Sequence, residues 1–303
     1  MSGKPMRRLS AITLFLLCIV LALQAQTQSF PQDQKGILIR CDDLGMCHAV
    51  NMAAIQVLKS GLPVSCSVMF ACPWYQEAVD ILKQYPHASV GVHLTLNAEW
   101  KNYRWGPVSG TSAVPSLVDS VGYFFPSRAA LFGNKPSLKE IETELRAQIG
   151  RALKSGLRID YLDYHMGAAV NTLETRQLVE SLAKEYGLAI SRYFGEVDAA
   201  GVYSAQPASK VDTLLVRLAD LPVGKISLFV FHIGLQTPEM DALIDLNVSG
   251  PRDMSKHREA ELKALLSSDV RAALQRSDVK ALTYRDLLTS VGVKNMKRPE
   301  LKD

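Results

Sequence analysis

Basic runs, glycine-rich loops and paired cysteines are all missing from this 303-residue sequence, and each absence removes a class of function. The formal net charge is only +4, and no basic run is interleaved with aromatic residues, which disfavours a nucleic-acid partner. No glycine-rich phosphate loop follows the first apolar run, where the sequence reads Asp-Asp-Leu-Gly, so dinucleotide binding is disfavoured. None of the five cysteines forms a C-x-x-C pair, which disfavours a cysteine-ligated zinc site.

Four cysteines lie beyond the N-terminal apolar run, namely Cys41, Cys47, Cys66 and Cys72. Four are too few to act as a disulfide framework in a chain of this length. Cys41 and Cys66 fall within apolar runs, and we expect them to be small buried residues. Whether any of the four forms a disulfide is left open by the sequence.

The N-terminus has the pattern of a secretory signal peptide. Lys4, Arg7 and Arg8 precede an apolar run over residues 11–23, which is short for a membrane span. A cut after Ala25 would leave a single domain over residues 26–303, periplasmic or secreted and without stable membrane association. Leu23 is an unusual residue three positions before such a cut, so an uncleaved anchor is the alternative.

The rest of the chain has an ordinary globular composition, with 48% apolar and 21% charged residues. Apolar runs typical of strands alternate with segments of helical periodicity, which predicts a parallel sheet. The predicted strands start at residue 37 and then cover residues 63–70, 89–96, 159–165, 189–194, 226–232 and 279–284. The predicted helices cover residues 49–58, 75–84, 137–153, 172–186, 210–219, 258–266, 268–274 and a terminal stretch from 285. About seven such units predict a distorted or incomplete (β/α) barrel.

Residues 97–136 interrupt this alternation with a long segment that has no periodic run. A loop of this length in a compact domain is usually functional. Its aromatic residues, including Trp100, Tyr103 and Trp105, could stack on sugar rings or simply pack the loop down. The following helix opens with Ser137 and Glu140, which fit a capping box.

Asp42 and Asp43 follow the first predicted strand directly, at the end where α/β folds place their chemistry. Side chains alternate along a strand, so the two carboxylates can share a site only if the backbone turns between them. A helix N-cap is the competing interpretation, because aspartate is a favoured capping residue and a helical pattern follows.

Three of the six histidines also lie at or near the ends of predicted strands, namely His93, His165 and His232. In one parallel barrel these ends converge on one face together with the aspartates. Two imidazoles and one carboxylate can hold a catalytic divalent metal ion, which lowers the pKa of a bound water and polarises a carbonyl. The remaining aspartate and histidine are then available as general base and general acid. The pattern predicts a metallohydrolase with one divalent ion and does not distinguish magnesium from zinc.

Four motifs in this order resemble the signatures of the YdjC-like carbohydrate deacetylases, which include the chitooligosaccharide deacetylases. They are Asp42-Asp43-Leu44-Gly45, the segment from Gly91 to Leu96 (GVHLTL), the segment from Glu144 to Gln148 (ELRAQ) and Asp163-Tyr164-His165. The resemblance covers residues 36–288. It implies a polysaccharide-deacetylase-like barrel that removes acetyl groups from N-acetylated saccharides with a divalent metal.

The resemblance also implies individual roles for residues of this chain. Asp43, His93 and His165 correspond to the metal ligands of the family. Asp42 corresponds to the general base and His232 to the acid that protonates the leaving amine. Arg192 matches a position near the substrate, and Tyr164 is expected to shape the same region.

Two positions depart from the family pattern. Gly167 stands where the family usually has a second histidine, and Ile233-Gly234 follows His232 where a proline and a glycine are usual. Metal binding is expected to survive both changes. The shape of the substrate site is expected to differ from that of the family.

Two other functions remain as alternatives. One is a metal-free glycoside hydrolase that uses Asp42 and Asp163 as its carboxylate pair. The other is a non-catalytic carbohydrate-binding protein derived from this fold. The sequence leaves the oligomeric state open, and a homodimer is one alternative.

Overall fold

The computed structural model of this chain describes residues 30–199, 202–248 and 250–300. The signal peptide and the cleavage after Ala25 fall outside these residues, so they stay predictions, as does the single domain from residue 26. No helix among the described residues is long and apolar enough to cross a membrane.

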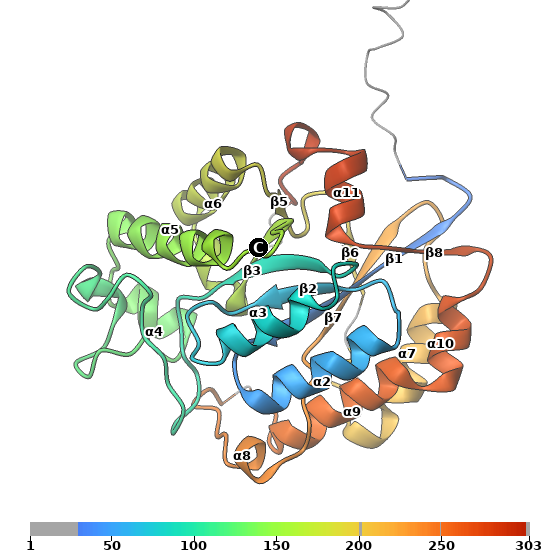
Figure 1. Cartoon of the computed structure of the whole chain (residues 1–303), viewed down its shortest axis with the longest axis horizontal. Coiled ribbons are helices and arrows are strands. Elements are labelled where there is room, and N and C mark those ends of the chain that lie inside the picture. Colours follow the sequence, from blue (N-terminus) through green and yellow to red (C-terminus); the bar gives the residue numbers. More distant parts are fainter. Residues whose placement is uncertain (1–29, 200–201, 249, 301–303) are drawn as a thin grey trace, which may run out of the picture.

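Eight parallel strands form one curled sheet, as the alternating pattern predicted (Figure 1). The strands are β1 (Lys35–Leu44), β2 (Ser65–Val68), β3 (Ser89–Leu94), β4 (Tyr161–Tyr164), β5 (Ala189–Ile190), β6 (Val197–Asp198), β7 (Ile226–Phe231) and β8 (Val279–Leu282). Their order is β5-β4-β3-β2-β1-β7-β6, and β8 pairs with the first half of β1. Within the described ranges the end strands β5 and β6 do not pair with each other, so the barrel is incomplete, as predicted.

The predicted strand over residues 189–194 is wrong in its second half. Only Ala189–Ile190 pair with β4, and the chain then turns. Arg192 has a φ of +72°, and the Glu196 carboxylate accepts the backbone N–H groups of Arg192 and Phe194. These bonds satisfy two backbone N–H groups inside the turn. The strand β6 that follows has only two residues, which is too short to show a periodic pattern in the sequence.

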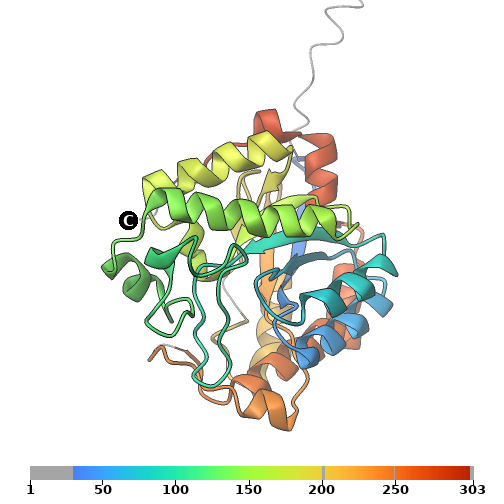
Figure 2. The same cartoon turned by 60° about the vertical axis from the view of Figure 1, so that its left-hand side comes forward.

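Helices surround the sheet on its outer side (Figures 1 and 2). They are α2 (His48–Lys59), α3 (Tyr75–Lys83), α4 (Arg128–Gly133), α5 (Leu138–Lys154), α6 (Leu173–Tyr186), α7 (Lys210–Ala219), α8 (Pro238–Asp241), α9 (Met254–Leu266), α10 (Ser268–Leu274) and α11 (Tyr284–Ser290). Four 3-10 turns cover Pro115–Leu117, His165–Val170, Pro207–Ser209 and Val293–Asn295. Helix α5 packs on α6, whereas α9 packs on α2 and α7. The short helix α4 lies in the segment 97–136, where the sequence predicted none.

Strand β1 alternates between two environments. Ile37 and Ile39 lie against Leu214 and Leu218 of α7, whereas Leu38 belongs to a smaller apolar cluster on the other face of the sheet. Arg40 and Asp42 follow Leu38 with a period of two, so they lie on the same face as Leu38. This inner face is therefore apolar at the start of β1 and charged at its end.

Two local predictions have different outcomes. Ser137 is the N-cap of α5 but makes no side-chain cap bond, so the capping box is wrong. Glu140 instead accepts the backbone N–H and the hydroxyl of Ser116, which ties the long loop to the helix. Cys41 and Cys66 are buried, as predicted, and all four described cysteines are free thiols.

Candidate metal centre

Asp42 and Asp43 both reach the inner face because the backbone turns between them. The pairing of β1 with β2 is interrupted by an irregularity between Cys41 and Leu44, and Asp43 has a φ of +66°. This left-handed conformation is one that aspartate tolerates better than most residues. The N-cap of α2 is Cys47, without a side-chain cap bond, so the capping interpretation of the aspartates is wrong.

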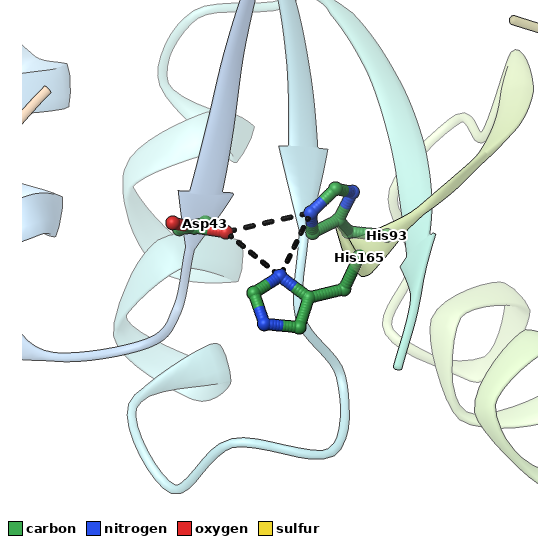
Figure 3. Close-up of side chains that lie close together, drawn as sticks. All are labelled: Asp43, His93 and His165. Carbon is green, nitrogen blue, oxygen red and sulfur yellow. Dashed lines mark hydrogen bonds and ion pairs between the residues drawn. The ribbon is translucent and has the colours of Figure 1, made fainter. Parts of the chain in front are cut away.

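Asp43, His93 and His165 converge at the carboxyl ends of three strands (Figure 3). Asp43 Oδ1 lies 3.4 Å from His93 Nε2 and 3.3 Å from His165 Nδ1, and the two nitrogens are 3.4 Å apart. Three ligand atoms around a four-coordinate ion with bonds of about 2.0–2.1 Å have this spacing. Asp43 Oδ1 is buried and has no hydrogen-bond partner, so the three residues fit a bound cation.

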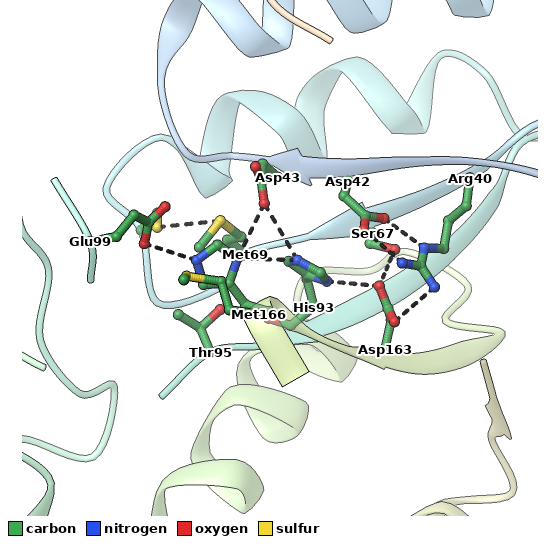
Figure 4. A network of polar contacts seen from close by, with 12 residues as sticks. Arg40, Asp42, Asp43, Ser67, Met69, His93, Thr95, Glu99, Asp163 and Met166 are labelled. Atoms are coloured by element: carbon green, nitrogen blue, oxygen red, sulfur yellow. Dashed lines mark hydrogen bonds and ion pairs between the residues drawn. The ribbon is translucent and has the colours of Figure 1, made fainter. Parts of the chain in front are cut away.

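Two carboxylates orient the imidazoles of this group (Figure 4). His93 Nδ1 donates to Asp163 Oδ2 at 2.9 Å, and His165 Nε2 donates to Glu99 Oε2 at 3.0 Å. Each bond places a proton on the outer nitrogen, so the inner nitrogen can present its lone pair to an ion. Carboxylate partners of this kind are typical of metal-ligating histidines.

The charge balance of the buried network also points to a cation. Asp42, Asp43, Glu99 and Asp163 are four buried carboxylates, and two buried guanidinium groups contact them, those of Arg40 and Arg258. With neutral imidazoles the network therefore carries two negative charges, which one divalent cation would balance. Buried charge without such compensation is costly.

Without a metal ion, protons supply this compensation. Burial lowers the pKa of both imidazoles, but nearby carboxylates outweigh it. Asp42 and Asp163 raise the pKa of His93 to about 9, and Glu99 and Asp43 raise that of His165 to about 10. Burial also raises the pKa of Asp43, yet Arg258 and the two imidazoles hold it well below its usual range. A cation would thus bind in exchange for protons.

Arg40 fixes the two carboxylates that stand beside the three candidate ligands. Its Nε and Nη2 donate to the two oxygens of Asp42 at 2.7 Å, and Nη1 lies 2.9 Å from Asp163 Oδ1. Nη1 also donates to Ser191 Oγ at 2.6 Å. Each Asp42 oxygen keeps a further lone pair, so this pairing leaves the carboxylate able to accept a proton.

His232 lies just beyond β7, one residue after Phe231, which is paired with Cys41. Its ring is half-buried, its Nδ1 is buried without a partner, and Tyr203 lies 5.0 Å away. The backbone N–H of His232 donates to Glu261 Oε2 at 2.6 Å, and Glu261 also pairs with the buried Lys210. The register places His232 next to Asp42, but no hydrogen bond among the described residues joins it to the three candidate ligands.

Arg192 and Tyr164 lie together, outside the group of candidate ligands. The Arg192 guanidinium stands 5.9 Å from the centre of the Tyr164 ring and pairs with Asp198 at 2.9 Å. This contact joins the ends of β4 and β5. The role of both residues in substrate binding stays a prediction.

Gly167 follows His165 in a left-handed conformation, with a φ of +72°. A Cβ atom at this position would lie 3.3 Å from Nη1 of Arg128. The position where the family usually has its second histidine therefore faces α4 rather than the three candidate ligands.

The aromatic residues of the long loop pack against the protein. Trp100 and Trp105 are buried, and the Trp105 ring lies 6.2 Å from the His165 ring. Glu144 of α5 holds this loop by accepting the backbone N–H groups of Val108 and Ser109 at 2.9 Å. Packing, rather than stacking on sugars, is thus the role of both tryptophans.

Replacing Glu144 by glutamine should destabilise the protein by about 1–3 kcal/mol, because the new amide N–H groups would face buried donors. Urea unfolding measures the loss, and hydrogen exchange at Val108 and Ser109 should show that the loop loosens. Glu142→Gln is the control, because Glu142 makes a half-exposed ion pair with Arg146 on the same helix. Equal effects of the two substitutions would contradict this role of Glu144.

Glu99 and Arg258 are site residues that the sequence did not single out. Glu99 is an isolated carboxylate among apolar neighbours such as Ala98 and Trp100, which is a weak signal of burial. Arg258 lies in a charged segment, which usually indicates a solvated surface, and no sequence feature distinguished it.

The fold and these residues define an α/β protein whose site lies at the carboxyl ends of parallel strands, with an Asp-His-His group at its centre. The chain matches the YdjC-like protein family over residues 36–276 and belongs to that family.

Curated relatives of similar length carry the name carbohydrate deacetylase. One, from Thermus thermophilus, is 32% identical over 83% of this chain and 93% of its own length. Another, from Enterococcus faecalis, is 28% identical over 84% of this chain and 98% of its own length.

Among solved structures, one from Enterococcus faecalis named for the cleavage of cellobiose phosphate has the same fold. It aligns with a TM-score of 0.67 and 22% identity over 84% of this chain and 99% of its own.

Proposed function

We propose that this protein is a metal-dependent carbohydrate deacetylase that releases acetate from N-acetylated sugars or oligosaccharides. The observation that carries the proposal is the buried group of Asp43, His93 and His165, whose three ligand atoms face one another at 3.3–3.4 Å. The names of the curated relatives support the reaction class.

The roles of the residues follow from their positions. Asp43, His93 and His165 would hold the ion, while Asp163 and Glu99 keep the imidazoles oriented. The ion would supply Lewis acidity for the acetyl carbonyl and lower the pKa of the attacking water. Asp42, held by Arg40, would take a proton from that water.

His232 would complete the reaction by protonating the amine as it leaves. The oxygen of water forms a bond to the acetyl carbon, the C–N bond breaks, and the products are acetate and a free amino sugar. General acid catalysis of this kind typically contributes about 10²–10⁴-fold to the rate. Tyr164 and Arg192 would line the sugar site beside this centre.

The glycoside hydrolase alternative is disfavoured by the state of Asp163. Burial raises the pKa of Asp163, but Arg40 and His93 lower it by a larger amount. The pKa therefore lies below its usual range, and the carboxyl stays ionised. A glycosidase needs one protonated carboxylic acid. The Arg40 guanidinium that lowers the pKa of Asp163 lies 2.9 Å from its Oδ1.

Acetate release from a panel of N-acetyl saccharides, measured with purified protein before and after chelation, tests the proposal. We expect acetate and free amine in equal amounts, loss of both after chelation, and recovery on adding zinc or magnesium. Release of reducing ends without acetate would instead indicate a glycosidase. Saccharide binding without turnover, whichever metal is added, would indicate a binding protein.

The N-terminal pattern supports the further proposal that the enzyme works in the periplasm or outside the cell. Mass spectrometry of the mature protein tests this directly. An N-terminus at Gln26 would support it, whereas a retained N-terminus in the membrane fraction would identify an anchor.

A further inference from the structure

Arg258 of α9 contacts Asp43 from the side opposite the imidazoles. Its Nη2 donates to Asp43 Oδ2 at 2.7 Å, and both side chains are almost completely buried. The imidazoles of His93 and His165 approach the other oxygen, Oδ1. The two oxygens of one carboxylate thus have separate partners.

This division decides how Asp43 can bind a cation. A carboxylate with two free oxygens can coordinate an ion with one oxygen or with both. Here Oδ2 accepts a charge-assisted hydrogen bond, and the positive charge of its Arg258 donor opposes a cation at the same oxygen. Turning the carboxylate to offer both oxygens would leave the Arg258 guanidinium buried without its partner, which is costly.

The Arg258 guanidinium is buried beside an aromatic ring and has one polar partner among the described residues. Its Nε and Nη1 are buried without partners, so Asp43 is the only residue that binds its guanidinium among the described ranges. The guanidinium carbon lies 5.9 Å from the centre of the Trp100 ring. A Cβ atom at Gly234 would lie 3.2 Å from Cβ of Arg258, so the chain just after His232 also leaves room for it.

We propose that Arg258 is a positioning residue that restricts Asp43 to one ligand oxygen and so keeps the bound ion at three protein ligand atoms. This inference rests on the proposed metal centre and adds a determinant of its coordination number. Three protein ligands leave a position open for water and substrate, as catalytic sites require. Arg258 needs no contact with the substrate for this role.

The test uses Arg258→Met, which keeps much of the side-chain volume and removes the donor. Zinc affinity is measured by competition with a chelator, and the absorption spectrum of the cobalt-substituted protein reports the coordination number. We expect about 10-fold tighter zinc binding, because Asp43 can then offer a second oxygen and the site loses a positive charge. We also expect weaker cobalt bands, because Asp43 would then bind through both oxygens.

Arg176→Met is the matched control, since Arg176 is a buried arginine that makes no contact with the candidate ligands. It should leave both readouts unchanged. Arg258→Lys keeps a charge but loses the fork of donors, and it should bind zinc with an affinity between those of wild type and Arg258→Met. If Arg258→Met does not fold, Arg258→Lys is used for the same two measurements.

Wild-type affinity and an unchanged cobalt spectrum in the Arg258 variants would overturn the inference and leave the proposed function intact. Failure of the wild-type protein itself to bind zinc or cobalt would overturn the metal centre instead. The two failures are therefore distinguishable in one series of measurements.

Discussion

Replacing Asp43 by asparagine is expected to lower acetate release by about 10³-fold or more, because a metal ion supplies several kcal/mol of transition-state stabilisation. The asparagine lacks the charge that Oδ1 presents to the ion, although its shape is nearly the same. Zinc binding should be lost in parallel with turnover. Chelator competition and acetate release measure the two effects on one preparation.

The same substitution should also destabilise the protein by about 3–5 kcal/mol, since it leaves the buried guanidinium of Arg258 without its anion. This second effect could be mistaken for the cause of the first. The double variant Asp43→Asn with Arg258→Met separates them, because it removes both charges. We expect it to recover most of the stability and none of the zinc binding.

Asp160→Asn is the matched control for this series. Asp160 is buried, pairs with Arg285, and lies just before β4, at the end of the sheet opposite the site. Its replacement should lower stability and leave zinc binding unchanged. Acetate release that persists in a folded Asp43→Asn protein would contradict the role of Asp43 as a ligand.

The strands and most helices could be predicted because their periodicity is a local property of the sequence. Strand β7 shows it most clearly, as an almost wholly buried apolar run interrupted only by Ser227, and residues 37–39 of β1 form a shorter run of the same kind. The position of Asp42, Asp43, His93 and His165 at strand ends then predicted that they meet, since parallel strands bring their carboxyl ends to one edge. The four residues do lie together.

Contacts between distant segments could not be predicted in this way. Arg258 and Asp43 are 215 positions apart, and nothing local distinguishes this arginine from one on a solvated helix face. The turn at Asp43 is local, yet it depends on the irregular pairing with β2, which no sequence pattern specifies. Similarly, Glu140 forms no capping box because the loop at Ser116 supplies better donors.

Replacing Arg40 by methionine is expected to destabilise the protein by about 3–5 kcal/mol at neutral pH, because two buried carboxylates then lose their shared cation. The cost should depend on pH. Burial raises the pKa of Asp163, but Arg40 and His93 lower it more, so the folded pKa lies below the unfolded value. The stabilisation is therefore complete above an unfolded pKa of about 3.9 and is lost as the pH falls further.

Urea unfolding at neutral pH and at about pH 3, below the unfolded pKa, measures this dependence, and the difference in unfolding free energy between variant and wild type should narrow at the lower pH. Arg276→Met is a closely matched control. Arg276 binds Asp278 through the same two nitrogens and at the same spacing of two residues, but both side chains are about 40% exposed. Solvent screens such a pair, so its loss should change stability far less. Equal effects of the two substitutions would mean that burial of the Arg40 network contributes nothing, which would contradict the charge balance inferred for the site.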